Sequence, residues 1–501
     1  DLEFKMKDRL KNELKIIDNY FKDNKLSRRE AIKLMGLAGT GVLASSSTLE
    51  AKELNNSSEA SGHIVIVGGG LAGMATAARI RDLSQNTKIT IIEPNPDSVS
   101  YQPGQTLIAG GLWTKEDIIY KTKDFLTNDV TLIEEKALEF DPKNNKLTTD
   151  SGNTFEYDAL IIAAGIKLNY SAIKGLEEAG EAYSIGDNSK LVKELNSVGA
   201  SSIYTVAGAS ETWENINKFI VTCKNTDSIH NAIFTHPNTP IKCGGAPKKI
   251  MYLMNSILKE NNVRDKVNMH FYPNGGAMFG IKDYHEAIVK QFEREKFNYS
   301  YKHNLVEVSK GNAIFNKHSI KKGAWDEDLE EYEAVKVNEK IEVPFDFLHI
   351  TPPMKAPDEI GNSPLGSKKG WVPVNKETLQ HVKFDNVFAL GDIAAVPMGK
   401  TGGSARKQYK VVTNNVLSIL KDGSIPSDSE KYDGYTVCPL ITSIGSVMLA
   451  EFNWASKKTG SGKNAASISL LDPTQERYIW WLLKLYLLKP MTVYGMLSGK
   501  A

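Results

Sequence analysis

Apolar and polar residues occur in alternating blocks from residue 62 onward, and these blocks predict buried strands separated by helices. An apolar run at 64–67 is followed by an alanine-rich segment and then by a second apolar run at 89–92. Short apolar runs bounded by turn residues are typical of buried strands, and a helix between two of them is typical of a parallel crossover unit. The pattern predicts an α/β protein whose folded body begins near His63.

The turn after the first apolar run carries a glycine motif. Gly68, Gly70 and Gly73 form a G-x-G-x-x-G pattern that includes Gly69, and Glu93 ends the second run 20 positions after Gly73. Such glycines allow a tight turn and a close approach of the backbone to a pyrophosphate, and the following helix offers its first N–H groups to the phosphates. Glu93 would accept hydrogen bonds from an adenosine ribose. Strand, turn, helix, strand and acid together predict a dinucleotide-binding domain.

Two later apolar runs favour FAD over NAD as the dinucleotide. "VKFDNVFALGDIAAVP" (382–397) places Gly391 and Asp392 after an apolar strand. It resembles the distal flavin motif of flavoproteins with two dinucleotide-binding domains, in which the Asp carboxylate holds the ribityl chain. "FEYDALIIAAGIK", which contains Gly165, resembles the strand that leaves the FAD domain of the same proteins.

The segment between these motifs lacks the glycine triplet that an NADH site requires. "SIYTVAGASETWENI" has no such triplet, and the strand-like "NAIFTHPNTPIKCGG" leads to a Pro-rich loop with Cys243. Lys242, Lys248 and Lys249 surround this cysteine in the sequence, and cationic neighbours favour the reactive thiolate. A thiol is therefore the expected entry point for electrons, and a type-2 NADH dehydrogenase is disfavoured.

Cys438, in "KYDGYTVCPLIT", is the natural partner of Cys243. The two cysteines could form a structural disulfide that closes a long loop, or a redox pair in which one sulfur attacks and the other resolves. Cys223 has no turn chemistry around it and is expected to be an incidental thiol. His236 and His349 could shuttle protons, or could be packed or surface residues.

An apolar, aromatic segment at 476–499 predicts how the chain meets a membrane. Lys484, Lys489 and Pro490 interrupt it, so it does not offer the roughly 20 uncharged residues of a spanning helix. Arg477 and Lys484 share one helix side, and the tryptophans at 480 and 481 suit the lipid headgroup level. We expect an interfacial helix at 478–497, the alternative being a helix packed on the protein's own core.

The net charge, the cysteine count and the N-terminal sequence limit which partners and which cellular location are expected. With 61 basic and 60 acidic residues the net charge is +1, which argues against nucleic acid as a partner. Three cysteines without a C-x-x-C pair offer neither a disulfide scaffold nor a metal site. "LSRREAIKLMGLAGTGVLASSSTLEA" (26–51) has the basic, apolar and small-residue order of a twin-arginine export signal, which predicts the periplasmic face of the inner membrane.

Several longer stretches resemble the mitochondrial type of sulfide:quinone oxidoreductase from about His63 to the C-terminus. These are "NTPIKCGGAPKKIMYL", "ITPPMKAPDEIGNSPL", "NKETLQH", "FALGDIAAVPMGKT" and "KYDGYTVCPLIT". The resemblance implies an FAD enzyme that passes electrons from hydrogen sulfide to a quinone and hands sulfane sulfur to an acceptor. It implies that Cys243 and Cys438 are the redox cysteines, and that FAD is contacted by Gly69, Gly70, Glu93, Gln102, Ala137, Asp392 and Lys400. The chain departs from the family pattern by its leader, by Cys223 and by extra residues in "GAWDEDLEEYEAV".

The expected organisation has two Rossmann-like domains and a C-terminal membrane-binding region. The leader and linker occupy 1–61, the FAD-binding domain 62–165 and 346–428, the inserted second domain 166–345, and the second redox cysteine with the membrane-interface region 429–501. Two other functions stay open. A flavin subunit of a flavocytochrome c sulfide dehydrogenase would pass electrons to a haem protein, and a non-catalytic flavoprotein would sense persulfide.

Overall fold

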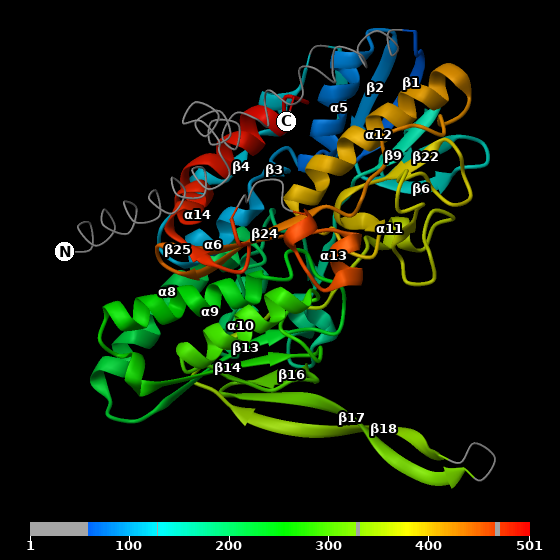
Figure 1. The fold of residues 1–501 in the computed structure, drawn as a ribbon. Coiled ribbons are helices and arrows are strands. Elements are labelled where there is room, and N and C mark those ends of the chain that lie inside the picture. Colours follow the sequence, from blue (N-terminus) through cyan, green and yellow to red (C-terminus); the bar gives the residue numbers. More distant parts are fainter. Residues whose placement is uncertain (1–58, 128, 327–330, 466–470, 501) are drawn as a thin grey trace, which may run out of the picture. The chain divides into compact units, whose positions relative to one another are not determined.

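A computed structural model describes residues 59–127, 129–326, 331–465 and 471–500 (Figure 1). The chain forms two compact units, each assembled from separate segments. Unit 1 contains the described residues of 1–103, 118–166 and 355–501, and unit 2 contains those of 104–117 and 167–354. The predicted leader at 26–51 lies outside the described residues.

Unit 1 is built on a five-stranded parallel sheet of order β22-β9-β1-β2-β5. Its strands are short, β-branched and apolar, and β1 and β9 bury nearly every side chain, as expected for a sheet covered on both faces. The bounds are β1 (Gly62–Val67), β2 (Thr87–Ile92), β5 (Val130–Ile133), β9 (Ala159–Ile162) and β22 (Val387–Ala389). The runs predicted from the sequence at 64–67 and 89–92 are therefore confirmed as parallel neighbours.

Two long helices lie side by side in unit 1, namely α5 (Leu71–Leu83) and α12 (Gly402–Asp422) (Figure 1). The α5 helix crosses from β1 to β2, and α12 follows β22 after a short connection. Both begin directly after a glycine-containing turn, so both helix starts lie at the carboxyl ends of sheet strands. This is where open α/β sheets bind their ligands.

Smaller antiparallel sheets complete unit 1. One comprises β6 (Ala137–Asp141), β7 (Lys146–Thr149) and β8 (Thr154–Glu156). Another comprises β24 (Thr436–Ser443), β25 (Ser446–Phe452) and β26 (Glu476–Arg477). The C-terminal helical run follows β26 at once as α14 (Tyr478–Leu482), η9 (Leu483–Leu487), α15 (Leu488–Pro490) and η10 (Met491–Met496).

Unit 2 is built on a second five-stranded parallel sheet, of order β12-β19-β13-β14-β15. The strands are β12 (Ala200–Ser201), β13 (His230–His236), β14 (Val267–Pro273), β15 (Asn298–Tyr299) and β19 (Phe347–His349). The connecting helices are α8 (Val206–Asn225), α9 (Ala246–Glu260) and α10 (Lys282–Arg294). The two parallel sheets confirm the predicted α/β class.

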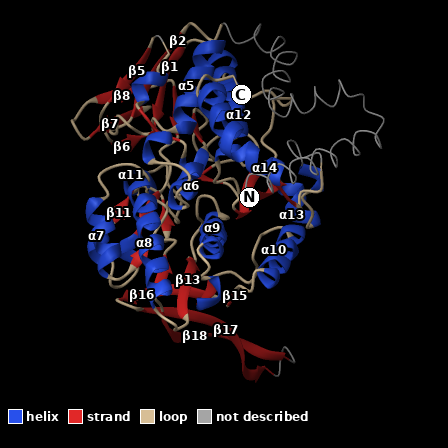
Figure 2. Cartoon of the chain, turned by 90° about the vertical axis from the view of Figure 1, so that its left-hand side faces the viewer, coloured by secondary structure: helices blue, strands red, loops and turns tan. Residues whose placement is uncertain are grey.

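A long two-stranded ribbon also belongs to unit 2 (Figure 2). Strands β17 (Asn312–Asp326) and β18 (Glu331–Pro344) pair along their length, whereas β16 (His303–Ser309) pairs only with the base of β17. The ribbon contains most of the extra residues noted in the sequence.

The borders of the units differ from the expected ones at two places. Residues 346–354 belong to unit 2, although they were assigned to the second part of the FAD-binding domain. The segment 104–117, which contains α6 (Gln105–Ala109), belongs to unit 2, although it was assigned to the FAD-binding domain. The reason is packing, because α6 contacts α8 and α9, and the ring of Trp213 lies against Gly111.

Candidate functional site

The glycine turn after β1 is shaped for a close ligand. Gly68 has φ 108°, and a Cβ there would lie 2.5 Å from the carbonyl oxygen of Ala163. A Cβ at Gly73 would lie 1.9 Å from the carbonyl oxygen of Gly68, so only glycine lets α5 start this close to β1. By contrast, a Cβ at Gly70 would meet only the Ser98 carbonyl oxygen at 3.9 Å. The side of the turn at Gly70 is therefore open.

Glu93 fixes the other side of this turn. Its carboxylate accepts from Gly69 N at 2.9 Å and from Asn95 N at 2.8 Å. Burial raises the pKa of Glu93, and these two backbone hydrogen bonds oppose that rise. Ser98 Oγ donates to Gly69 O at 2.9 Å. A carboxylate can accept about four hydrogen bonds, so Glu93 retains capacity for ribose hydroxyls.

The distal motif lies beside the same helix start. Gly391 has φ 72°, and a Cβ on it would lie 3.4 Å from the Ala72 Cβ of α5. Its N–H donates at 2.8 Å to Oε1 of Gln408, which lies in the second turn of α12. The sequence analysis missed Gln408, although a glutamine among the apolar positions of a helix is the signal that could have found it.

Lys400 is half-buried and closes the loop that follows Asp392. Its ammonium donates to the backbone carbonyl of Asp392 and lies 4.0 Å from the ring centroid of Trp371. Burial lowers the pKa of Lys400 to about 8, and the Asp392 carboxylate opposes this shift. The side chain of Lys400 therefore fixes the backbone at Asp392, just after the end of β22.

The remaining predicted flavin contacts lie on three other segments of unit 1. Gly165 has φ 70° and no atom within 4 Å of where a Cβ would be, so it presents open backbone after β9. Ala137 is buried at the start of β6, and Gln102 is exposed.

These features fit FAD. A helix start preceded by open glycine backbone suits a pyrophosphate, the Glu93 carboxylate suits a ribose, and the Asp392 segment lies beside the first residues of α5. The described residues contain no cluster of His, Cys, Asp and Glu side chains with the geometry of a metal site.

Cys243 lies directly before helix α9 in unit 2. It has φ 51°, a left-handed conformation that is uncommon for a non-glycine residue, and its carbonyl accepts from Ala246 N at 2.8 Å. Lys249 Nζ donates to Cys243 Sγ at 3.3 Å. A half-buried sulfur at a helix start beside an ammonium is a setting that favours the thiolate.

The other two lysines near Cys243 have different partners. Lys248 Nζ donates to Gly244 O at 3.3 Å and lies 5.2 Å from the ring centroid of Phe271. The ammonium of Lys242 donates to Ser184. The sequence analysis treated the three lysines alike, whereas the structure places the ammonium of Lys249 at hydrogen-bond distance from the sulfur.

Cys438 lies in β24 of unit 1, opposite Ala450 of β25, and is buried. Its neighbour Val437 packs against the start of α12, where a Cβ at Gly403 would lie 2.2 Å from Val437 Cγ1. Cys438 is thus on a strand beside the distal motif.

Cys223 is fully buried in α8, and burial raises the pKa of its thiol, which fits a packing residue.

His236 and His349 are neutral packing residues at neutral pH. His349 is fully buried, accepts from Ile203 N through Nε2 at 3.2 Å and stacks on Phe234. Burial lowers the pKa of His349 to about 3 and that of His236 to about 4. Such values do not suit proton transfer near pH 7.

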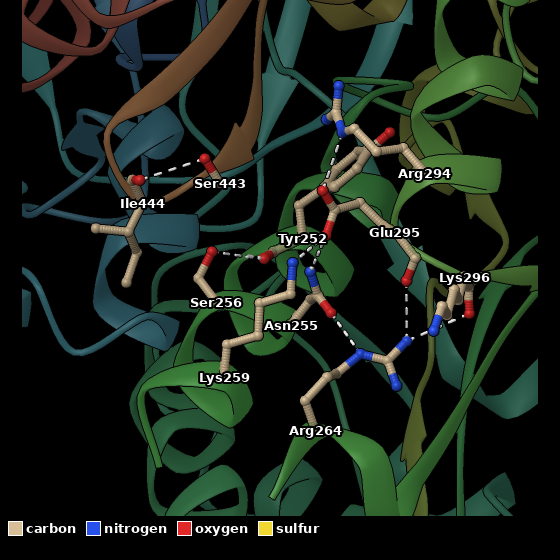
Figure 3. A network of polar contacts seen from close by, with 10 residues as sticks. All are labelled: Tyr252, Asn255, Ser256, Lys259, Arg264, Arg294, Glu295, Lys296, Ser443 and Ile444. Carbon is tan, nitrogen blue, oxygen red and sulfur yellow. Dashed lines mark hydrogen bonds and ion pairs between the residues drawn. The ribbon is translucent and has the colours of Figure 1, made fainter. Parts of the chain in front are cut away.

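The far end of α9 is anchored to α10 by a polar network (Figure 3). Arg264 Nε donates to Asn255 Oδ1 at 2.5 Å, and a second guanidinium nitrogen donates to the backbone carbonyl of Glu295 at 3.1 Å. The Glu295 carboxylate accepts from Asn255 at 2.8 Å and pairs with Lys259 at 2.5 Å. The network fixes the helix whose first turn carries Lys249.

The C-terminal run has a buried face and an exposed face, and the buried face differs from the expectation. Lys484 is fully buried and donates to Pro103 O at 3.3 Å, and Arg477 is buried too, so the side that carries these cations is covered by the protein. Trp480 and Trp481 are also buried and are not available at a headgroup level. The exposed large side chains of the run are Tyr486, Leu487 and Tyr494, which are 66%, 44% and 78% exposed.

No helix among the described residues is both long enough and apolar enough to cross a bilayer.

Comparison with known proteins identifies the family. The family model of pyridine nucleotide-disulphide oxidoreductases matches residues 62–212. The mitochondrial sulfide:quinone oxidoreductase of Mus musculus is 34% identical over 423 residues, covering 84% of this chain and 83% of the relative. That of Dictyostelium discoideum is 33% identical, covering 87% of this chain and 86% of the relative.

A solved structure shows the same fold. The sulfide:quinone oxidoreductase of Aquifex aeolicus superposes with a TM-score of 0.64 at 20% identity, covering 87% of this chain and 91% of that one. The sequence relatives reported above are similar over most of the chain, so they show common family membership in addition to the shared fold. The chain belongs to the sulfide:quinone oxidoreductase family.

Proposed function

We propose that this chain oxidises sulfide and passes the electrons through FAD to a quinone. The observation that carries the proposal is the contact between Lys249 Nζ and Cys243 Sγ at the start of α9. It supports an activated sulfur in the domain where a pyridine nucleotide site would otherwise be expected. The relatives named above carry the same activity in their names.

The proposed thiol chemistry starts from a disulfide between Cys243 and Cys438. Hydrosulfide attacks one sulfur, so a new S–S bond forms as a persulfide, the Cys–Cys bond breaks, and the other cysteine leaves as a thiolate. A nucleophilic sulfane-sulfur acceptor, such as a thiol or sulfite, then removes the outer sulfur. The two cysteines are left as thiolates that hold the electron pair. Which cysteine carries the persulfide is not assigned.

Bound FAD would supply the two-electron acceptor for the thiolate pair, whose oxidation restores the disulfide, and the donor to the quinone. The residues of the chain supply binding and charge. Glu93 and the turn at Gly68–Gly73 would hold the adenosine and pyrophosphate, and Asp392 the ribityl chain. The ammonium of Lys249 stabilises a sulfur anion at Cys243, both when hydrosulfide opens the disulfide and when the disulfide forms again.

We further propose that unit 1 meets a membrane through the exposed face of its C-terminal run. Tyr486, Leu487 and Tyr494 are large, apolar or amphipathic, and exposed. Aromatic side chains of this kind favour the bilayer interface, while the opposite face is tied to the unit's own core. Such an interfacial helix gives a lipid-soluble quinone a route to the flavin.

The location on one side of a membrane remains a separate proposal. The twin-arginine-like segment at 26–51 favours export to the periplasmic face. The sequence relatives reported above are named as mitochondrial proteins. Fusing 1–61 to a reporter that is active only after export tests this proposal, and retention of the reporter in the cytoplasm contradicts it.

The activity is tested by the absorbance of the bound flavin under anaerobic conditions. Sulfide should bleach the flavin, and a short-chain ubiquinone should restore its colour, whereas NADH should do neither at a comparable rate. Bleaching that only a cytochrome c reverses would favour the flavocytochrome alternative. Sulfide that leaves the flavin oxidised while a persulfide forms would favour a sensor.

A further inference from the structure

Four cations gather on the neighbouring helices α5 and α12 of unit 1. Arg79 lies on α5, and Arg406, Lys407 and Lys410 lie within the first three turns of α12. Arg79 is buried, Arg406 and Lys410 are half-buried, and Lys407 is exposed. We call these four residues the cationic cluster.

The cluster is held together by the fold. The Arg406 guanidinium lies 6.0 Å, and Lys407 Nζ 5.7 Å, from the ring centroid of Tyr435. Arg406 and Lys410 are four positions apart on one helix, an arrangement in which like charges repel each other. The ring of Tyr435 thus holds the cations of Arg406 and Lys407 on the helix that also carries Lys410.

Lys410 shows the electrostatic consequence. Its pKa is lowered to about 8, first by burial and then by the charges of Arg79, Lys407 and Arg406, and Glu430 is the acid that opposes this shift. In the part of the chain that the structure describes, none of the three α12 cations has a carboxylate within ion-pair distance. A bound anion would relieve both the repulsion and the desolvation.

The cluster adjoins the end of the C-terminal run. Arg79 donates to the carbonyl oxygen of Gly499 at 3.3 Å, and a Cβ on Gly499 would lie 2.6 Å from Arg79 N. The exposed Tyr494 precedes Gly499 by little more than one helical turn. Cations beside exposed aromatic residues match the two parts of a lipid at an interface, a charged headgroup and the acyl region below it.

We propose that the cationic cluster binds the phosphate headgroup of an anionic phospholipid at the membrane surface. The inference rests on the proposed interfacial role of the C-terminal run, and it adds the lipid chemistry that this role selects. A basic face that is merely solvated would not need three of its four cations to be buried or half-buried.

The test measures binding of the FAD-loaded full chain to sedimented vesicles. One set is phosphatidylcholine alone, and the other contains phosphatidylglycerol in addition. The variant Arg406→Gln/Lys410→Gln removes two charges of the cluster. The control variant Lys457→Gln/Lys458→Gln removes two exposed charges from α13 (Trp454–Thr459) of the same unit.

The wild type and the control should bind the anionic vesicles more tightly than the neutral ones. The cluster variant should lose this preference by about fivefold per removed charge, and its binding to neutral vesicles should not change. High salt should reduce the preference of the wild type. If the double variant loses FAD, the exposed Lys407→Gln replaces it in the same comparison.

Equal losses in the cluster and control variants would show a non-specific charge effect and overturn the proposal. Inorganic phosphate that competes with anionic vesicles at low concentration would identify a soluble anion site instead. If the wild type binds no vesicle but still bleaches with sulfide, the lipid proposal fails while the proposed activity stands. If it binds anionic vesicles but does not bleach, the reverse holds.

Discussion

At the scale of single residues, the function depends on how α9 begins. Cys243 adopts a left-handed conformation, and the helix that follows brings Lys249 back to the sulfur one and a half turns later. A positive φ costs a non-glycine residue about 1–2 kcal/mol. Such a conformation, retained at a cysteine with two glycines beside it, indicates that the thiol itself is required there.

Lys249→Met should slow the reduction of the flavin by sulfide about tenfold or more, because a charge-assisted contact with the sulfur is lost. Stopped-flow absorbance measures this rate. Lys248→Met is the matched control, since Lys248 is equally buried and contacts Gly244 and Phe271 instead. Equal rates in the two variants would show that Lys249 has no special role.

A buried histidine predicts how the stability of unit 2 varies with pH. The folded pKa of His349 is about 3, below its usual 6.5, so the unfolded chain binds a proton between these values that the folded chain does not. Stability should therefore fall as the pH drops through this window, by roughly 1 kcal/mol per pH unit for this residue. His236 and His270, with pKa values of about 4, act in the same direction.

His349→Gln should weaken this dependence, because a glutamine oxygen can still accept from Ile203 N but does not titrate in this range. Urea unfolding at pH 7 and at pH 5 measures the difference. The variant contradicts the account if its stability falls with pH as steeply as that of the wild type.

At the scale of elements, the C-terminal run separates what a sequence can show from what it cannot. Its apolar and aromatic composition was visible, but composition does not tell which face is covered. Lys484, which interrupts the apolar pattern, is buried against the Pro103 carbonyl. A lysine donor can be buried when a backbone acceptor is available, and that acceptor lies 381 positions away in the sequence.

The buried face also changes the best test of the membrane role. A chain that ends before Tyr478 would uncover the core that Trp480 and Trp481 cover, and the loss of folding would obscure the result. The triple variant Tyr486→Ser/Leu487→Ser/Tyr494→Ser changes only exposed side chains. It should keep FAD and its bleaching by sulfide.

The same triple variant should detach from phosphatidylcholine vesicles, and its reoxidation by a long-chain quinone should slow several-fold relative to a soluble short-chain quinone. Vesicle sedimentation and flavin absorbance give the two readouts. Leu138→Ser, at an exposed apolar position on β6, is the control. Unchanged vesicle binding in the triple variant would place the membrane contact elsewhere.

At the scale of the whole molecule, the FAD-binding half could be predicted because its signals are local. Strand β1, the turn at Gly68–Gly73 and strand β2 lie close together in the sequence. The distal motif likewise consists of a strand and the glycine that directly follows it. The segment 104–117 could not be assigned in this way. Its place in unit 2 is decided by contacts with α8 and α9, more than 90 residues later.

The site followed the same rule. Glu93, Asp392 and Cys243 belong to contiguous motifs, so they could be proposed from the sequence. Gln408 and Trp371 act through contacts with Gly391 and Lys400 that only the fold creates. Sequence spacing also could not distinguish Lys249 from its two neighbours, because the turn of the helix decides which ammonium reaches the sulfur.

The central claim is that electrons enter the flavin through Cys243 and Cys438, and anaerobic stopped-flow absorbance of three serine variants tests it most directly. Cys243→Ser and Cys438→Ser should each retain FAD and lose nearly all sulfide-dependent bleaching. Cys223→Ser should bleach like the wild type, since that thiol is buried in α8. Rapid bleaching of the Cys243→Ser protein, with its FAD content intact, would contradict the account.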